Sequence, residues 1–412
     1  MAKNVLLLSR LILGAVFVFS GFVKAVDPLG FTYKMEDYLV AMGPFFEQFS
    51  SVAFGSSILL SAVELVIGLN FLFGIRMKET TWVAALFMLV MTPLTLWIAL
   101  DNPVHDCGCF GDALVISNWA TFWKNIAIDI VLLVIFFLLK KHHAFVAAKT
   151  QWIFTVYALF FSIALSVYCY RHLPLLDFRP YSNGSNIIKG MHIPDDAEPD
   201  SFDIKLVYAK DGIEKEFSME DYPRNDSTWV FVDQKTVLIK KGYEPPIHDF
   251  TIESLEDGDI TDLVLENADY SFLLVSYDFS KADLSRAAEI NAIYDYAKEN
   301  GYNFYALTAS VSQDIESYLT KTKAAYPICL TDVITLKTIV RSNPGLVLLK
   351  DATVINKWHY NDLPEFVIPL EESGFSEIPK PEWAKKIAIV AILFLIGGVL
   401  ILFLGRRFNK KN

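Results

Sequence analysis

The residues best suited to chemistry lie in one short stretch, DCGCFGD at positions 106–112, directly after NPVH at 102–105. Two cysteines that are one residue apart can join in a small disulfide ring, and the neighbouring glycines provide the flexible backbone that such a ring needs. A small ring is strained, and strained, exposed disulfides exchange rather than staple the chain. We therefore interpret Cys107 and Cys109 as a candidate redox-active pair.

The two residues before this pair would act on its thiols in opposite directions. His105 favours a thiolate, whereas Asp106, like Asp112, raises the pKa of a nearby thiol. Two other interpretations of the stretch stay open. One is a soft-metal site formed by Cys107, Cys109 and His105, in which only three ligands are visible. The other is a structural pair, or two inert thiols.

The composition is that of a membrane protein. Of the 412 residues, 53% are hydrophobic and 20% are charged, whereas a soluble domain carries about 25% charged residues. The surplus of apolar residues lies in runs of about 20, the length that crosses a hydrocarbon layer of about 30 Å. This pattern excludes a soluble cytoplasmic enzyme, and the net charge of -11 argues against nucleic acid as a partner.

We expect six membrane-spanning helices. The first run is too long for the apolar core of a signal peptide, so we interpret it as an uncleaved helix. The expected spans are residues 5–25, 55–75, 80–100, 119–139, 151–170 and 385–405.

The positive charges in the short loops predict the orientation. Ten Lys and Arg residues collect on one side, whereas the other side has only Lys24 and Lys34. Lys and Arg favour the cytoplasmic side, so both termini are expected there. Residues 26–54, 101–118 and 171–384 would then face outward, which in a bacterium is the periplasm. Within the first of these loops, residues 31–43 suit either an interfacial helix or a packed loop helix.

Ionisable residues inside membrane spans are costly and are usually functional or paired. Arg10, Glu64 and Asp129 are therefore candidates for a quinone or proton path. The alternative is that they form buried ion pairs that fix helix packing, with Arg10 and Glu64 as one such pair. Cys169, at the outer end of the fifth helix, is either a relay thiol for the Cys107–Cys109 pair or a small apolar filler.

The outer region divides into two parts. Residues 174–244 are predicted to form a linker and a small β-rich unit, with a hairpin around Lys210 and a second pair of strands, TWVFVD and TVLIKKG. Residues 245–370 alternate between strands and helices, which predicts a central sheet with helices on its faces. Cys329 is expected in the core of this domain. Residues 371–384 would link it to the last helix.

This second part resembles a thioredoxin-like domain of membrane-tethered reductases. The matching segments are the opening PIHDFT at 246–251 and the stretch SNPGLVLLKDATVINKW at 342–358, in which Pro344 corresponds to the family's cis-proline. Thioredoxins carry C-x-x-C after the first central strand, but residues 276–283 read SYDFSKAD and contain no cysteine. The resemblance therefore implies the fold and a role in binding, without dithiol chemistry.

Residues 1–140 resemble the DoxX/MauE superfamily of four-helix membrane proteins. The resemblance rests on Arg10, the SGFVK segment at 20–24, Glu64 within AVELVIGLNFLFG, the CGCFGD loop and Asn125. Together with the outer thioredoxin-like domain and the last helix, the arrangement is similar to one common in Bacteroidota. The resemblance implies sulfur redox chemistry at the membrane, with a quinone as a candidate cofactor. No metal is expected.

The sequence thus predicts a membrane α-helical four-helix bundle of the DoxX/MauE type, followed by further membrane helices and an extramembrane α/β thioredoxin-like domain. The expected domains are 1–145, 146–173, 174–244, 245–370, 371–384 and 385–412. The expected function is periplasmic thiol–disulfide exchange, with the lipid bilayer and a periplasmic protein client or redox partner as contacts. A non-catalytic scaffold and a membrane subunit of a quinone-linked oxidoreductase remain alternatives, so enzymatic activity and oligomeric state stay open.

Overall fold

The computed structural model describes residues 2–104, 107–142, 147–199, 201–210, 212–224, 226–240, 242–378 and 383–409. Within these residues, six helices are long and apolar enough to cross a membrane, in agreement with the six predicted spans. They are α1 (Ala2–Val26), α4 (Ser50–Phe73), α5 (Met77–Asp101), α6 (Asn118–Leu138), α7 (Ala148–Arg171) and α13 (Trp383–Asn409). The protein is a multi-pass membrane protein.

Helices α1 and α4 run antiparallel and approach each other closely through glycines. A Cβ atom on Gly21 would lie 2.4 Å from the backbone nitrogen of Leu65, and one on Gly68 would lie 2.5 Å from that of Val18. Small residues allow such close packing between membrane helices. The resulting alignment places Glu64 of α4 beside the end of α1 that leads into the first loop.

The first loop folds into two short helices, α2 (Pro28–Ala41) and α3 (Pro44–Glu47). The Asp27 side chain caps α2 by accepting a hydrogen bond from the Gly30 N–H at 2.9 Å, and proline follows at the first helical position. Thr32 binds the Ser57 hydroxyl of α4 at 2.8 Å. The first half of α2 is therefore a packed loop helix, which is one of the two interpretations open from the sequence.

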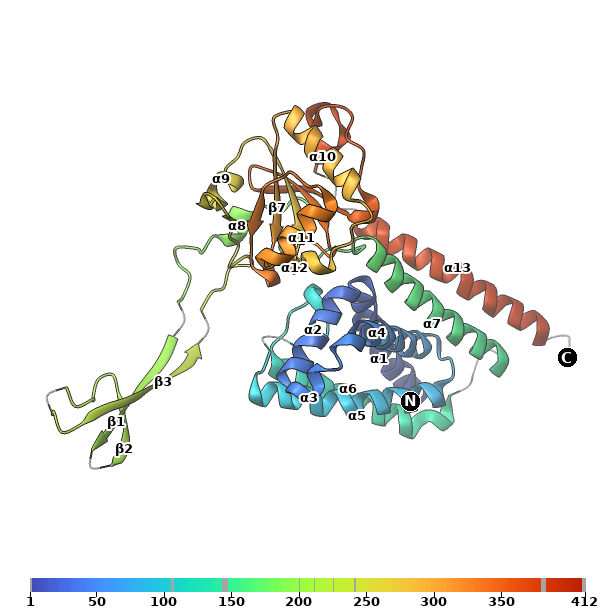
Figure 1. Cartoon of the computed structure of the whole chain (residues 1–412). Helices are drawn as coiled ribbons and strands as arrows, with labels where there is room; N and C mark the ends of the chain where they lie inside the picture. Colours follow the sequence, from blue (N-terminus) through green and yellow to red (C-terminus); the bar gives the residue numbers. More distant parts are fainter. Residues whose placement is uncertain are drawn as a thin grey trace. The chain divides into compact units, whose positions relative to one another are not determined.

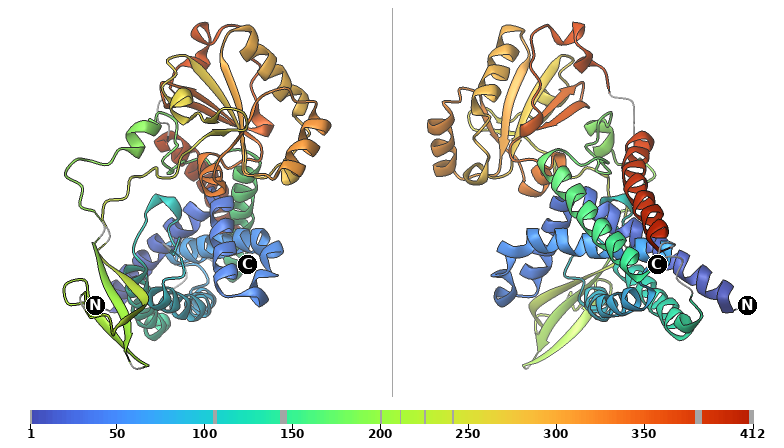
Figure 2. Two further views of the ribbon diagram at one scale, coloured as in Figure 1. Left: turned by 60° about the vertical axis from the view of Figure 1, so that its left-hand side comes forward. Right: turned by 90° about the vertical axis from the view of Figure 1, so that its right-hand side faces the viewer.

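The last helix, α13, packs along α7 (Figure 1, Figure 2). The Tyr157 hydroxyl donates a hydrogen bond to the backbone oxygen of Phe394 at 3.0 Å. A Cβ atom at Gly397 would lie 2.4 Å from that hydroxyl oxygen. The two helices that flank the extramembrane region in sequence therefore lie together.

The extramembrane α/β domain is built on a sheet with the strand order β10-β9-β6-β7-β8-β4-β5. Strands β6, β7 and β8 are parallel, whereas β9 and β10 run antiparallel to their neighbours. The order and directions of β10, β9, β6 and β7 are those of the thioredoxin fold, which confirms the predicted fold. The strands are β4 (Glu253–Ser254), β5 (Gly258–Asp259), β6 (Tyr270–Ser276), β7 (Asn303–Thr308), β8 (Ile328–Leu330), β9 (Gly345–Lys350) and β10 (Thr353–His359).

Helices connect the parallel strands and cover the sheet. Every residue of β6 is buried, as expected for a central strand with both faces covered. Aromatic side chains from the segment after β10, including Phe366 and Phe375, pack against the same core. The helices are α9 (Thr261–Leu265), α10 (Ala287–Glu299), α11 (Ser312–Thr322) and α12 (Val333–Ile339).

Residues Asn186–Phe250 form a separate compact unit. It contains α8 (Ile187–Met191) and a sheet with the order β2-β1-β3, formed by β1 (Ser201–Lys210), β2 (Ile213–Ser218) and β3 (Val230–Lys240). The predicted hairpin of β1 and β2 is confirmed. The predicted second pair of strands is wrong, because β3 is one strand that pairs with β1 on both sides of the polar Gln234-Lys235 segment.

Candidate functional site

Residues 107–112 (CGCFGD) are called the CGC loop below. Its two cysteines lie against each other as free thiols. Their sulfur atoms are 3.1 Å apart, and both residues are buried, with 6% and 7% exposure. Gly108 between them has a φ of 60°, a left-handed conformation that favours glycine. A Cβ atom at Gly108 would also lie 3.1 Å from the Cγ of Lys34. The glycine therefore lets the loop turn back so that the sulfurs meet.

The sulfur separation lies between that of a disulfide and that of two thiolates on one metal ion. Two sulfurs that bind one tetrahedral Zn²⁺ at about 2.3 Å each would be about 3.8 Å apart, which is more than the observed 3.1 Å. A disulfide needs the sulfurs to approach to about 2.05 Å. Among the described residues, no group of three or more His, Cys, Asp or Glu side chains is arranged to hold a metal ion.

Two helices hold the backbone of the CGC loop. From α2, the Tyr38 hydroxyl donates a hydrogen bond to the Cys107 carbonyl oxygen. From α1, the Ser20 hydroxyl lies 2.8 Å from the Cys109 carbonyl oxygen. Apolar side chains that include Ile98 pack around the two sulfurs. The loop is therefore held on two sides, and its thiols lie in an apolar environment.

Positive charges from α1 and α6 act on the sulfurs. The Lys24 ammonium forms a buried ion pair with Glu64 at 2.6 Å. The Lys124 ammonium lies over the Phe110 ring, 4.4 Å from its centroid. Hydrogen bonding from the Cys107 thiol, with help from the charges of Lys124 and Lys24, lowers the pKa of Cys109 to about 6 against the opposing effect of burial. The same thiol–thiol hydrogen bond and burial raise the pKa of Cys107.

This asymmetry gives a prediction for alkylation as a function of pH. The rate of Cys109 modification should rise with pH, reach half of its maximum at about pH 6 and change little above pH 8, because alkylation needs the thiolate. Cys107 should react only in alkaline solution. The measurement is timed alkylation of the full chain in detergent, with fragment-ion assignment of the modified cysteine. A Cys109 midpoint above pH 8 would contradict the prediction.

The structure brings some of the predicted site residues together. Cys107 and Cys109 are adjacent, and Glu64 reaches the CGC loop through Ser20, whose hydroxyl lies 2.7 Å from the Glu64 Oε2 atom. His105 and Asp106 lie outside the described residues.

The predicted ion pair between Arg10 and Glu64 is wrong, because Glu64 binds Lys24 instead. The alignment of the antiparallel helices explains this, since Arg10 lies three to four turns of α1 away from Lys24. Arg10 donates a hydrogen bond to the Leu72 carbonyl oxygen at 3.5 Å, near the opposite end of α4.

The three candidates for a quinone or proton path do not line one site. Asp129 accepts a hydrogen bond from Thr92 at 2.8 Å. Glu64 is instead paired with Lys24, and Arg10 with the Leu72 carbonyl oxygen. An apolar groove of about 1760 Å³ lies along α1, α4, α7 and α13, and its lining includes none of Arg10, Glu64 and Asp129. The structure therefore does not bring these three residues together.

The remaining sequence candidates lie elsewhere. Cys169 is 1% exposed and packs with residues of α1 and α7 that include Val26, in a cluster separate from that of the cysteine pair. Its surroundings suit an apolar filler. Cys329 is fully buried on β8. The Asn343–Pro344 peptide bond is cis.

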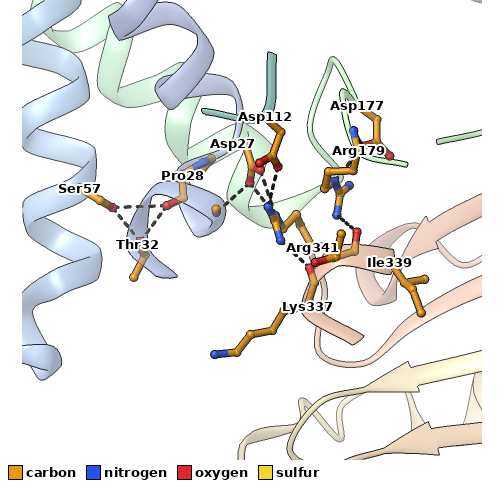
Figure 3. Close-up of polar contacts among 12 residues, drawn as sticks. Asp27, Pro28, Thr32, Ser57, Asp112, Asp177, Arg179, Lys337, Ile339 and Arg341 are labelled. Carbon is orange, nitrogen blue, oxygen red and sulfur yellow. Dashed lines mark hydrogen bonds and ion pairs between the residues drawn. The ribbon is translucent and has the colours of Figure 1, made fainter. Parts of the chain in front are cut away.

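An arginine of the thioredoxin-like domain binds the end of the CGC loop (Figure 3). The Arg341 guanidinium is 2.9 Å from an oxygen of Asp27, at the junction of α1 and α2, and 3.1 Å from one of Asp112. Its Nη1 also donates to the Lys337 carbonyl oxygen of α12. Arg341 follows α12 and precedes the cis-proline, so this edge of the thioredoxin-like domain contacts the CGC loop.

Aromatic contacts extend the same interface. The Tyr33 ring of α2 packs against the Tyr277 ring, which directly follows β6, with centroids 6.2 Å apart. The Lys337 ammonium lies over the Tyr33 ring at 4.3 Å. The helix that holds the Cys107 carbonyl is thus also the helix on which the thioredoxin-like domain rests.

Sequence reasoning missed the site roles of Ser20, Lys24, Lys124, Tyr38 and Arg341. One signal was present for two of them, because Ser20 and Lys24 are four residues apart and share a helix face. No local signal pointed to Arg341, whose carboxylate partner Asp27 is 314 residues away in sequence.

No curated protein matches the chain. The solution structure of a candidate protein disulfide isomerase from Bacteroides thetaiotaomicron is similar at 13% identity and a TM-score of 0.23, over 39% of this chain and 90% of that one. Residues 202–241 match a domain of unknown function (DUF8463). Residues 2–141, which contain α1 to α6 and the CGC loop, match the family described as methylamine utilisation protein MauE.

Proposed function

We propose that the protein carries out thiol–disulfide exchange at the membrane through Cys107 and Cys109. The observation that carries this proposal is the 3.1 Å separation of two free sulfurs on a glycine turn. The positive charge of the short loops supports an orientation with both termini in the cytoplasm and the CGC loop in the periplasm of a bacterial inner membrane.

The exchange oxidises a client dithiol. A client thiolate attacks the Cys107 sulfur of the Cys107–Cys109 disulfide, the S–S bond breaks, and Cys109 leaves as a thiolate. The second client thiol then attacks the client sulfur of the mixed disulfide and releases Cys107, which takes the remaining proton. Two electrons have moved to the pair. A disulfide of a second protein reoxidises the pair by the same steps in reverse.

The different acidities of the two thiols support this order of events. A thiol with a lower pKa leaves faster in disulfide exchange, and the pKa of Cys109 is lowered to about 6. After the client has left, the pair returns to a thiol hydrogen-bonded to a thiolate. Its acidity and its 3.1 Å sulfur separation fit this reduced state.

The thioredoxin-like domain is proposed to hold a protein partner near the CGC loop without redox chemistry of its own. Residues 276–283 contain no cysteine, and the domain contacts the loop through Arg341 and Asp112 at 3.1 Å. Contact with the domain would bring a client thiol close to Cys107.

The redox state of the pair in intact cells tests the proposal. Differential alkylation with mass readout, with and without a periplasmic reductant, should show a mixed population that shifts reversibly. Alkylation of the buried Cys329 thiol is the internal control, because it should remain unchanged. A pair that stays fully reduced or fully oxidised throughout would exclude cycling.

A membrane scaffold is the second candidate function, and the burial of both thiols favours it. A scaffold needs the CGC loop only as a folded contact for Arg341, so a Cys107→Ser, Cys109→Ser double variant would keep its biological activity. The exchange proposal expects that variant to lose it completely. Complementation of a deletion strain separates the two functions.

A further inference from the structure

A buried ion pair lies directly behind the CGC loop. Lys24 and Glu64 are 2% and 3% exposed, and the Lys24 Nζ atom is 2.6 Å from the Glu64 Oε1 atom. Taking two charges out of water costs several kcal/mol for each ion. Apolar contacts could stabilise the bundle equally well. The position of the ion pair next to two thiols therefore points to a role for its charge.

The pair is attached to the backbone of Cys109. The Ser20 hydroxyl is 2.7 Å from Glu64 Oε2 and 2.8 Å from the Cys109 carbonyl oxygen. A hydroxyl has one proton and can accept as well as donate, so it can connect both oxygens. Ser20 and Lys24 are one helical turn apart on α1, and Glu64 faces both from α4. The three side chains form one polar group inside the bundle.

The backbone fixes where this group lies. The close approach of α1 and α4 at Gly21, where a Cβ atom would be 2.4 Å from Leu65 N, prevents the helices from sliding past each other. The Lys24 ammonium also lies 4.8 Å from the centroid of the Phe31 ring on α2. Lys24 is therefore held by α1, α2 and α4 together.

A small cavity lies beside Lys24, next to the CGC loop. This cavity of about 30 Å³ is lined by Lys24, Gly108, Lys34 and Asp112, among others. That volume holds about one water molecule. Lys24 thus lines the same small cavity as Gly108, the residue between the two cysteines.

The charged and titratable groups facing Cys109 come from every packed element. They are Cys107 in the loop, Lys24 on α1, Glu64 on α4 and Lys124 on α6. The charges of Lys24 and Lys124 favour a thiolate at Cys109, and that of Glu64 opposes it. Since Glu64 forms an ion pair with Lys24, the net balance depends on Lys24 staying charged and in place.

We propose that Lys24, held by Glu64 and Ser20, is the positioning cation that stabilises the Cys109 thiolate when Cys109 leaves the disulfide. This inference deepens the proposed exchange function and rests on it for its biological meaning. In the mixed-disulfide state the Cys107 thiol can no longer donate to Cys109. The cations Lys24 and Lys124 are then the groups among the described residues that face the new thiolate with positive charge.

The test is the pH profile of Cys109 alkylation in the full chain in detergent. The Lys24→Gln variant should raise the midpoint by about one pH unit or more, because a nearby opposite charge shifts a pKa by about 1–3 units. The midpoint of the Lys24→Arg variant should stay close to that of the wild type. A control is Lys78→Gln, which removes an exposed lysine at the start of α5, the end of that helix away from the loop, and should leave the profile unchanged.

A second variant protects the test against misfolding. If Lys24→Gln does not accumulate, Lys24→Gln combined with Glu64→Gln leaves neither charge unpaired. It should still raise the midpoint, by less than the single variant, because the opposing charge of Glu64 is removed as well. An unchanged midpoint in the single or the double variant would overturn the inference. The redox state of the pair in cells is measured separately. A shifted midpoint with a pair that never cycles would exclude exchange but retain the role of Lys24, whereas cycling with an unshifted midpoint would exclude Lys24 alone.

Discussion

The Cys109→Ser variant should accumulate mixed disulfides on Cys107, formed when the Cys107 thiolate attacks the disulfide of an oxidised client or of the protein that reoxidises the pair and releases that protein's other sulfur as a thiolate. A mixed disulfide on Cys107 is normally cleared when Cys109 attacks it, and the variant lacks that thiol. Hydrogen bonding to Cys109 and burial raise the pKa of Cys107 in the wild type, and burial still acts on Cys107 in the variant. A thiol with a raised pKa leaves slowly, so these adducts should persist.

The opposite variant should trap fewer clients. In Cys107→Ser, any adduct on Cys109 has the better leaving group, because Lys24 and Lys124 still favour its thiolate. We expect at least about a tenfold difference in adduct yield between the two variants, as leaving-group acidity controls the exchange rate. Both should have lost redox cycling completely.

Non-reducing gels of membranes after acid quenching, followed by mass spectrometry of the adducts, provide the measurement. Cys169→Ser is the matched control, because it removes another buried cysteine that packs in a different cluster. That variant should cycle as the wild type does. If neither cysteine variant of the CGC loop formed mixed disulfides, client exchange at this loop would be ruled out. Equal trapping by both would contradict the assigned order of attack.

Much of the fold could be predicted because its signals are local. Apolar runs of membrane-spanning length identified the six helices of the described residues, and the alternation of strands and helices after residue 245 predicted a sheet with helices on its faces. The thioredoxin-like arrangement of that sheet came from the resemblance of residues 246–251 and 342–358 to the family. The prediction of two strands in place of β3 was wrong because it also relied on a local signal. A polar Gln234-Lys235 step looks like a turn locally, but pairing with β1 continues through it.

The candidate site was predictable only in part. The spacing of Cys107 and Cys109 sufficed to predict that the two sulfurs can meet, because the turn between them is formed by neighbours in sequence. The partner of Glu64 depends on which residue of α1 lies at the same depth, and that is decided by glycine contacts such as Gly21 against Leu65. A sequence shows that Arg10 and Glu64 are both charged, but not that they lie at different levels.

Removing the Arg341 side chain should free the Asp112 end of the CGC loop and thereby make the cysteine pair easier to reach. Arg341 is 6% exposed and binds Asp27 and Asp112. Breaking a fully buried pair costs about 3–5 kcal/mol. Here the two carboxylates are 21% and 40% exposed, so water recovers part of that loss. We expect Arg341→Ala to weaken docking of the thioredoxin-like domain by about 2 kcal/mol, or about 30-fold in the docking equilibrium.

Alkylation of Cys107 and Cys109 in the full chain measures this release. When opening and closing are fast, the labelling rate follows the open population, so it should rise by up to about 30-fold. The labelling rate of Arg341→Lys should lie between those of Arg341→Ala and the wild type. Lysine keeps the charge, but it lacks the planar guanidinium that binds two carboxylates at once. Arg286→Ala, at an exposed arginine paired with Glu289, should change nothing.

Cys329 distinguishes release of the domain from its unfolding. It is fully buried in the core of the thioredoxin-like domain, so its labelling rises only when that domain opens. Faster labelling of the CGC loop with unchanged labelling of Cys329 would mean that the intact domain has moved away from the cysteines. If the labelling of Cys107 and Cys109 stayed at the wild-type rate in Arg341→Ala, the arginine could not be what holds the domain over the loop. The contacts of Tyr33 with Tyr277 and Lys337 would then have to keep it there.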